Sequence, residues 1–108
     1  MFEFDKFLAD LKEQMTQLAK REFKENWQAA MKDGQDFLDN SKDKLQKYLK
    51  MLNNHEIDQD EFKSLAGHLG VQAEMEMLKQ AGLKAARIDQ FRTQAINLVI
   101  SAAFKFIV

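Results

Sequence analysis

The stretch Asn53–Leu65, NNHEIDQDEFKSL, lies at the middle of the 108-residue chain and decides its fold. Asp58 has the features of a helix N-cap, whose carboxylate accepts hydrogen bonds from the free backbone N–H groups of the first turn. Glu61 follows three residues later and would complete a capping box. Ile57 before the cap and Phe62 at the fourth helical position are placed for a hydrophobic staple. The stretch therefore predicts a corner at residues 53–58 and a helix that begins directly after it.

The second half of this stretch also resembles the end of a calcium-binding EF-hand loop. Such a loop needs oxygen ligands at its positions 1, 3 and 5 and a glycine at position 6. With Glu61 at the last position of the loop, Lys50, Leu52 and His55 would occupy positions 1, 3 and 6. A cation and a hydrocarbon cannot bind calcium, so we expect no calcium site here.

The rest of the chain has the composition of an all-α protein, with no proline and four glycines. Apolar residues recur at every third or fourth position, a spacing that keeps side chains on one face of a helix. This spacing runs through residues 4–52 and again through residues 59–106. The sequence therefore predicts two long helices, with weak points at Gly34, at residues 39–41 and at residues 64–71.

Folding these two helices back on one another gives a single helical domain over residues 1–108, a long antiparallel hairpin. A hairpin has one seam, whereas the apolar faces of this chain are wider than one seam can cover. Two hairpins could cover them by pairing into a four-helix bundle. The alternative is that both long helices break and that one copy folds alone as a bundle of four shorter helices.

An antiparallel hairpin also brings both ends of the chain together in an apolar pole. Residues 95–108 contain Lys105 as their one charged residue, and the first residues of the chain are rich in phenylalanine. Exposed apolar patches of this kind mark interaction sites. The predicted oligomer or membrane interface consists of Phe2, Phe4, Phe7, Leu8, Trp27, Met31, Leu38, Leu98, Val99, Phe104 and Phe106.

These features predict a non-enzymatic structural or interaction protein that associates with itself, in the simplest case as a homodimer. The alternative function is that of a peripheral membrane protein, or one that docks a partner helix, through the same pole. In the membrane case Lys84, Arg87 and Arg92 would face anionic headgroups.

Other functional classes lack the residues they require. The formal net charge is −1, without the basic excess of a nucleic-acid-binding protein. The first residues do not form a secretory signal, and no apolar run approaches the ~20 residues of a membrane span, so we expect a cytoplasmic protein that could associate with a membrane surface. There is no cysteine, neither histidine follows a glutamate at metal-site spacing, and no nucleophile or phosphate-loop motif is present. We therefore predict no catalytic residue, no metal and no cofactor.

Overall fold

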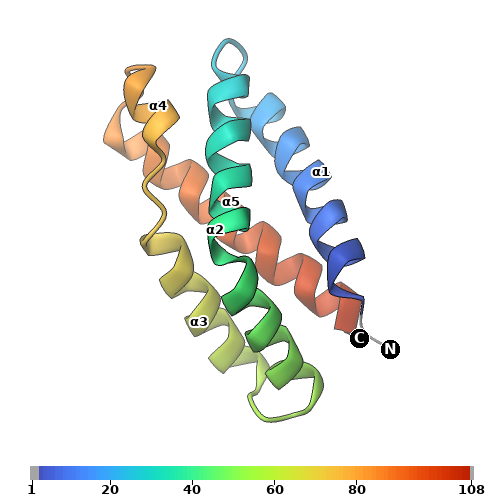
Figure 1. Ribbon diagram of the computed structural model, residues 1–108. Helices are drawn as coiled ribbons and strands as arrows, with labels where there is room; N and C mark the ends of the chain where they lie inside the picture. Colours follow the sequence, from blue (N-terminus) through green and yellow to red (C-terminus); the bar gives the residue numbers. More distant parts are fainter. Residues whose placement is uncertain (1–2, 108) are drawn as a thin grey trace.

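The computed structural model describes residues 3–107, and all regular structure among them is helical (Figure 1). The helices are α1 (Phe4–Glu22), α2 (Trp27–Asn53), α3 (Gln59–Val71), α4 (Glu76–Gln80) and α5 (Ala85–Ile107). The all-α prediction is thus confirmed. Phe2, one of the predicted interface residues, lies outside the described residues.

The helices lie side by side in a body of 42 × 22 × 19 Å. The chain reverses direction after α1, after α2 and before α5, while α3 and α4 follow one another along the same side (Figure 1). Helix α2 contacts all four other helices. The start of α1, the end of α5 and the connection between α2 and α3 gather at one end of the molecule (Figure 1).

The prediction of one continuous helix over residues 4–52 is wrong, because the chain turns at residues 23–26. Phe23 leaves the helical conformation with φ −131° and ψ 105°. Its ring is buried and packs edge-on against Phe91 of α5, with ring centroids 5.4 Å apart. A helical Phe23 would keep the apolar spacing equally well, so the sequence pattern does not reveal the turn. The contact with α5 is formed between distant segments and favours the break.

The prediction of one continuous helix over residues 59–106 is also wrong. Helix α3 ends at Val71, the last residue of the predicted weak point at residues 64–71, and the chain stays non-helical until Glu76. A second interruption separates α4 from α5, where Gly82 has a φ of 85° that favours glycine. The second half therefore forms three helical segments.

Two glycines mark places where helices approach closely. Gly34 lies inside α2 and does not break it. A Cβ at this position would lie 2.5 Å from Cγ of Met15 in α1. Gly70 lies near the end of α3, where a Cβ would overlap Cδ1 and Cγ1 of Ile96 in α5. Both positions have room only for the hydrogen atom of glycine, because the side chains of Met15 and Ile96 occupy the space that a Cβ would need.

The corner has the geometry expected from the sequence. Asp58 is the N-cap of α3, and its Oδ1 accepts a hydrogen bond of 2.7 Å from the backbone N–H of Glu61. Oε1 of Glu61 in turn accepts a bond of 3.1 Å from the backbone N–H of Asp58. Phe62 is fully buried and Ile57 is half-buried, so the apolar residues on both sides of the cap face the interior.

Replacing Asp58 with alanine is expected to lower the free energy of unfolding by ~0.5–2 kcal/mol, the usual contribution of an N-cap side chain. Urea unfolding followed by circular dichroism measures this loss. The matched control is Asp60→Ala, which removes the same charge from the same helical turn without removing a cap. Equal losses in both variants would show that charge near the helix start, and not the capping box, stabilises α3.

Candidate functional site

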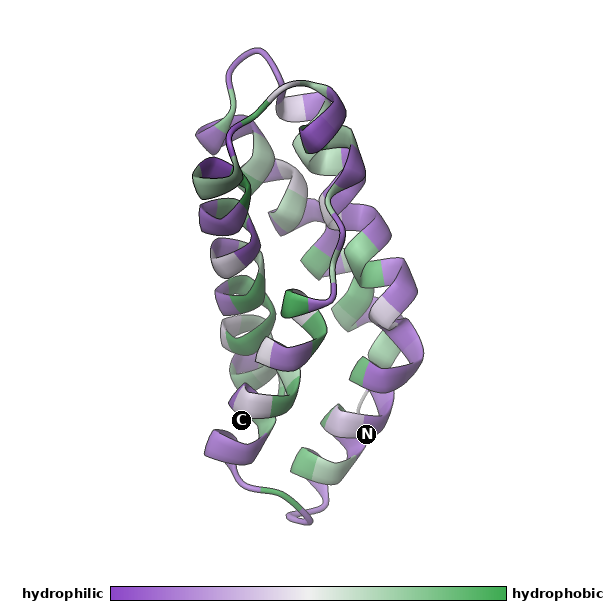
Figure 2. Ribbon diagram, turned by 90° about the vertical axis from the view of Figure 1, so that its left-hand side faces the viewer, coloured by the Kyte–Doolittle hydropathy of each residue, from purple (hydrophilic) through white to green (hydrophobic). Residues whose placement is uncertain are grey.

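The predicted interface residues separate into a buried group and a partly exposed group. Figure 2 shows the hydrophobic residues turned toward the space between the helices. The buried group belongs to the core of a single chain and consists of Phe4, Phe7, Leu8, Leu38 and Val99. The half-buried group consists of Trp27, Met31, Leu98, Phe104 and Phe106. Only the second group leaves apolar surface for a partner.

Within the half-buried group, Phe104 and Phe106 are brought together with aromatic residues from other helices. Phe106 packs edge-on against Phe7 with ring centroids 5.5 Å apart, and Phe7 lies 6.0 Å from Phe4. Phe104 lies 6.0 Å from Phe62 of α3. We call this end of the molecule, comprising these five phenylalanines with Ile57 and Ile107, the aromatic pole.

An open pocket of about 440 Å³ lies at the aromatic pole, between the corner and the end of α5. Its apolar lining comes from Leu52, Ile57, Phe104 and Ile107. His55, Asp58 and Gln59 add polar groups. We call it the terminal pocket. An apolar concavity with polar groups at its edge suits an aliphatic or aromatic side chain of a partner.

The charges around the terminal pocket are mixed. The corner and first turn of α3 contribute Glu56, Asp58, Asp60 and Glu61, all exposed. Lys63 reaches over the ring of Phe104, with its Nζ 5.8 Å from the ring centroid.

The basic residues predicted to flank the pole are found elsewhere. Lys84, Arg87 and Arg92 lie before or in the first turns of α5, whereas the aromatic pole is at its end. At 1.5 Å per residue, the helix places Lys84 and Arg87 roughly 30 Å, and Arg92 about 20 Å, from the two phenylalanines at its end. Arg87 donates a hydrogen bond to the carbonyl oxygen of Glu22 and stacks over Phe23. The expectation that these three residues surround the pole is therefore wrong.

Trp27, Met31 and Leu98 also lie away from the pole. Trp27 begins α2, at the opposite end of the molecule, and Lys20 lies over its ring with Nζ 4.8 Å from the centroid. Met31 follows one turn later, and Leu98 lies in the middle of α5. The structure thus divides the predicted interface among several places.

Polar side chains that the sequence did not single out hold the connection between α3 and α4, residues 72–75, and the start of α4 that follows it. Asp33 of α2 is buried, and its two oxygens accept hydrogen bonds of 2.9 and 2.8 Å from the backbone N–H groups of Met77 and Leu78. From α5, Arg92 donates two bonds, of 3.1 and 2.7 Å, to the carbonyl oxygen of Ala73. Asp33 thus fixes the start of α4 on α2, and Arg92 fixes the connection at Ala73 to α5.

Among residues 3–107, no helix is long and apolar enough to cross a membrane. In the same part of the chain, no three acidic, histidine or cysteine side chains are grouped so that they could hold a metal ion.

Comparison with protein family models, with curated proteins and with solved structures finds no match for this chain.

Proposed function

We propose that this chain is a non-enzymatic helical interaction protein that associates with a second copy of itself through the aromatic pole. The observation that carries the proposal is the terminal pocket, where Ile57, Phe104 and Ile107 remain half-buried around an open apolar space. The remaining apolar stripes are largely covered within one chain. The surface for association is accordingly narrower than the whole-helix faces that the sequence predicts.

The charges around the pole favour another protein over an anionic membrane. Four acidic residues at the corner would repel anionic headgroups, which attract clusters of lysine and arginine. In a two-fold symmetric contact, each patch of one copy meets the same patch of the other. Lys63 and Lys105 of one copy could then face the acidic corner of the second, and charge complementarity of this kind selects partners.

The experiment is sedimentation equilibrium of the protein from micromolar to millimolar concentrations. The wild-type protein is expected to dimerise reversibly, whereas a Phe104→Gln, Ile107→Gln double variant is expected to remain monomeric because the apolar contact is lost. Circular dichroism shows whether the double variant keeps its helical content. A wild-type protein that stays monomeric over the whole range would contradict the proposal.

The matched control is Val71→Gln. Val71 is the most exposed large apolar residue among those described, with 73% of its surface accessible to solvent. It lies at the far end of α3 from the aromatic pole. This variant is expected to dimerise like the wild type. Equal loss of association in Val71→Gln would mean that non-specific hydrophobic contacts, and not the aromatic pole, drive self-association.

The second candidate function is binding of a lipid surface by the same pole, and the half-buried Phe104 and Phe106 favour it. Flotation with zwitterionic and with anionic vesicles distinguishes the two. We expect no flotation in either case. A monomer that floats with vesicles, and loses this property in the double variant, would establish the membrane function instead.

A further inference from the structure

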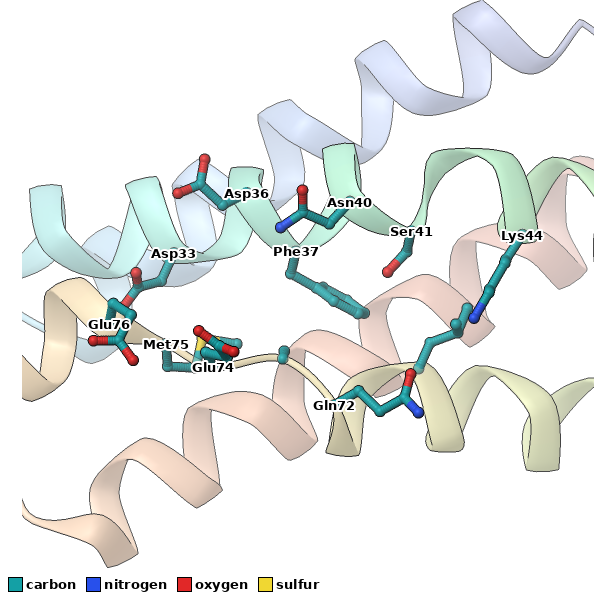
Figure 3. A pocket seen from close by; sticks show the side chains of 12 residues that line it. Asp33, Asp36, Phe37, Asn40, Ser41, Lys44, Gln72, Glu74, Met75 and Glu76 are labelled. Carbon is teal, nitrogen blue, oxygen red and sulfur yellow. The ribbon is translucent and has the colours of Figure 1, made fainter.

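A second pocket, of about 420 Å³, lies between α2 and residues 72–75, well away from the aromatic pole. We call it the linker pocket. We infer that it binds a small organic cation, an amine or guanidinium on a short carbon chain that carries a hydrogen-bonding group at its other end. Its lining includes Phe37, Ser41 and Lys44 of α2, with Glu74 and Glu76 on the opposite wall (Figure 3).

The first observation is an unpaired hydroxyl group. Ser41 is only 6% exposed, and Figure 3 shows its oxygen directed from α2 into the pocket. Among the described residues, no group forms a hydrogen bond with this hydroxyl. Thr16 and Thr93 bond instead to the carbonyl four residues earlier in their own helices. The Ser41 hydroxyl is thus available to a molecule that enters the pocket.

The second observation is the sign of the charge along the lining. Glu74 has no hydrogen-bond or ion-pair partner among the described residues. Glu76 pairs with Lys79 only at 3.7 Å. Asp36 is bonded on its outer side to Lys32 at 2.7 Å, a contact that raises the pKa of Lys32. Acidic lining residues outnumber the one basic lining residue, Lys44, so the pocket attracts a cation.

The arrangement of these groups also gives the ligand an orientation. In Figure 3, Glu74 and Glu76 lie toward α4, whereas Lys44 and Gln72 lie toward the other end of the pocket. Lys44 repels a positive group, so the charged end of the ligand points toward the acids. Its polar end then lies near Ser41.

The middle of the pocket suits a carbon chain. The side chain of Phe37 extends from α2 into the space between the two charged ends (Figure 3). Its ring offers an apolar surface, and an aromatic face also attracts a nearby cation. Leu69 and Ala73 add further apolar lining. The walls are fixed in advance by the bonds of Asp33 and Arg92 described above, which lowers the entropic cost of binding.

The probe for the test is aminopentanol, which joins an ammonium group to a hydroxyl group through a carbon chain. Amide chemical shifts of the isotopically labelled protein are followed during titration. We expect saturable shifts at Ser41, Ala73 and Glu74, and weaker binding at higher salt because surface charges are screened. Pentanol, which lacks the charge, is expected not to bind. Absence of saturable shifts with aminopentanol, or equal binding of pentanol, would overturn the inference.

Variants separate the role of the hydroxyl from that of the charge. Ser41→Ala is expected to weaken the binding of aminopentanol about tenfold, the equivalent of ~1.4 kcal/mol. The binding of pentylamine should not change, because pentylamine lacks the hydroxyl. Glu74→Gln is expected to weaken the binding of both aminopentanol and pentylamine. Ser64→Ala, on the exposed face of α3, is the matched control and should change neither. Unchanged aminopentanol binding in Ser41→Ala would overturn the assigned orientation and the inference with it.

Discussion

Replacing Asp33 with alanine is expected to lower the free energy of unfolding by about 2–4 kcal/mol, because two charge-assisted hydrogen bonds are lost at once. The backbone N–H of Leu78 is buried at this contact, and that of Met77 is partly buried. Without the carboxylate, each donor must find water or stay unpaired, and an unpaired buried donor costs ~1–3 kcal/mol. Urea unfolding followed by circular dichroism measures the change.

The matched control is Asp36→Ala, in the same helix one turn away. Asp36 forms an exposed ion pair with Lys32, and pairs of this kind contribute ~0–1 kcal/mol. Asp33→Asn should lie between the two, because one oxygen remains as an acceptor while the other becomes an N–H₂ group facing a donor. A loss in Asp33→Ala no larger than that in Asp36→Ala would show that α4 is held by its apolar contacts alone.

Replacing Gly70 with alanine is expected to destabilise the protein, although alanine is the better helix former by ~1 kcal/mol. The new methyl group would overlap the end of the Ile96 side chain, so α3 and α5 must separate or Ile96 must change rotamer. Overpacking of this kind typically costs ~1–3 kcal/mol. The loss of packing is therefore expected to exceed the gain in helix propensity.

Gly67 provides the control in the same helix. A Cβ at Gly67 meets no atom within 4 Å, so Gly67→Ala should stabilise the protein by the helix-propensity term alone. Shortening Ile96 to alanine makes room for the methyl group, and Gly70→Ala should then become neutral or stabilising in that background. Such a double-mutant cycle isolates the contact between the two residues. Equal effects of Gly70→Ala and Gly67→Ala in the wild-type background would exclude a close approach at Gly70.

The corner could be predicted from the sequence because every interaction that defines it is local. Asp58 and Glu61 are three residues apart and satisfy one another's backbone groups without help from the rest of the chain. The all-helical class follows for the same reason, since residue spacing and the absence of proline act within each segment.

The interruptions could not be predicted as reliably, because distant contacts decide them. Phe23 occupies the same apolar position whether the helix continues or turns, and the turn depends on Phe91, far along the chain. Gly34 has the opposite outcome: it is a weak helix former, yet α2 continues through it, and Met15 of α1 packs where a side chain would lie. Local propensity cannot distinguish these two cases.

The sequence gives weaker indications of the polar residues that line the linker pocket. Ser41 falls on the apolar stripe of α2, and a polar residue on such a stripe indicates either a buried bond or a site. Asp33, beside Gly34, has no local partner in the sequence. Its partners are backbone N–H groups, which leave no trace in residue identities.

The Asp33 contact also has a consequence for the order of folding. It joins residues 44 and 45 positions apart, so a long loop must close before either bond can form. Helix α4 has only five residues, too few to be stable in isolation. We therefore expect it to form late, after α2 and α3 have docked, and to open first in the native protein. The segment around it is where a protease would find the folded chain most accessible, and occupancy of the neighbouring cavity would shield it.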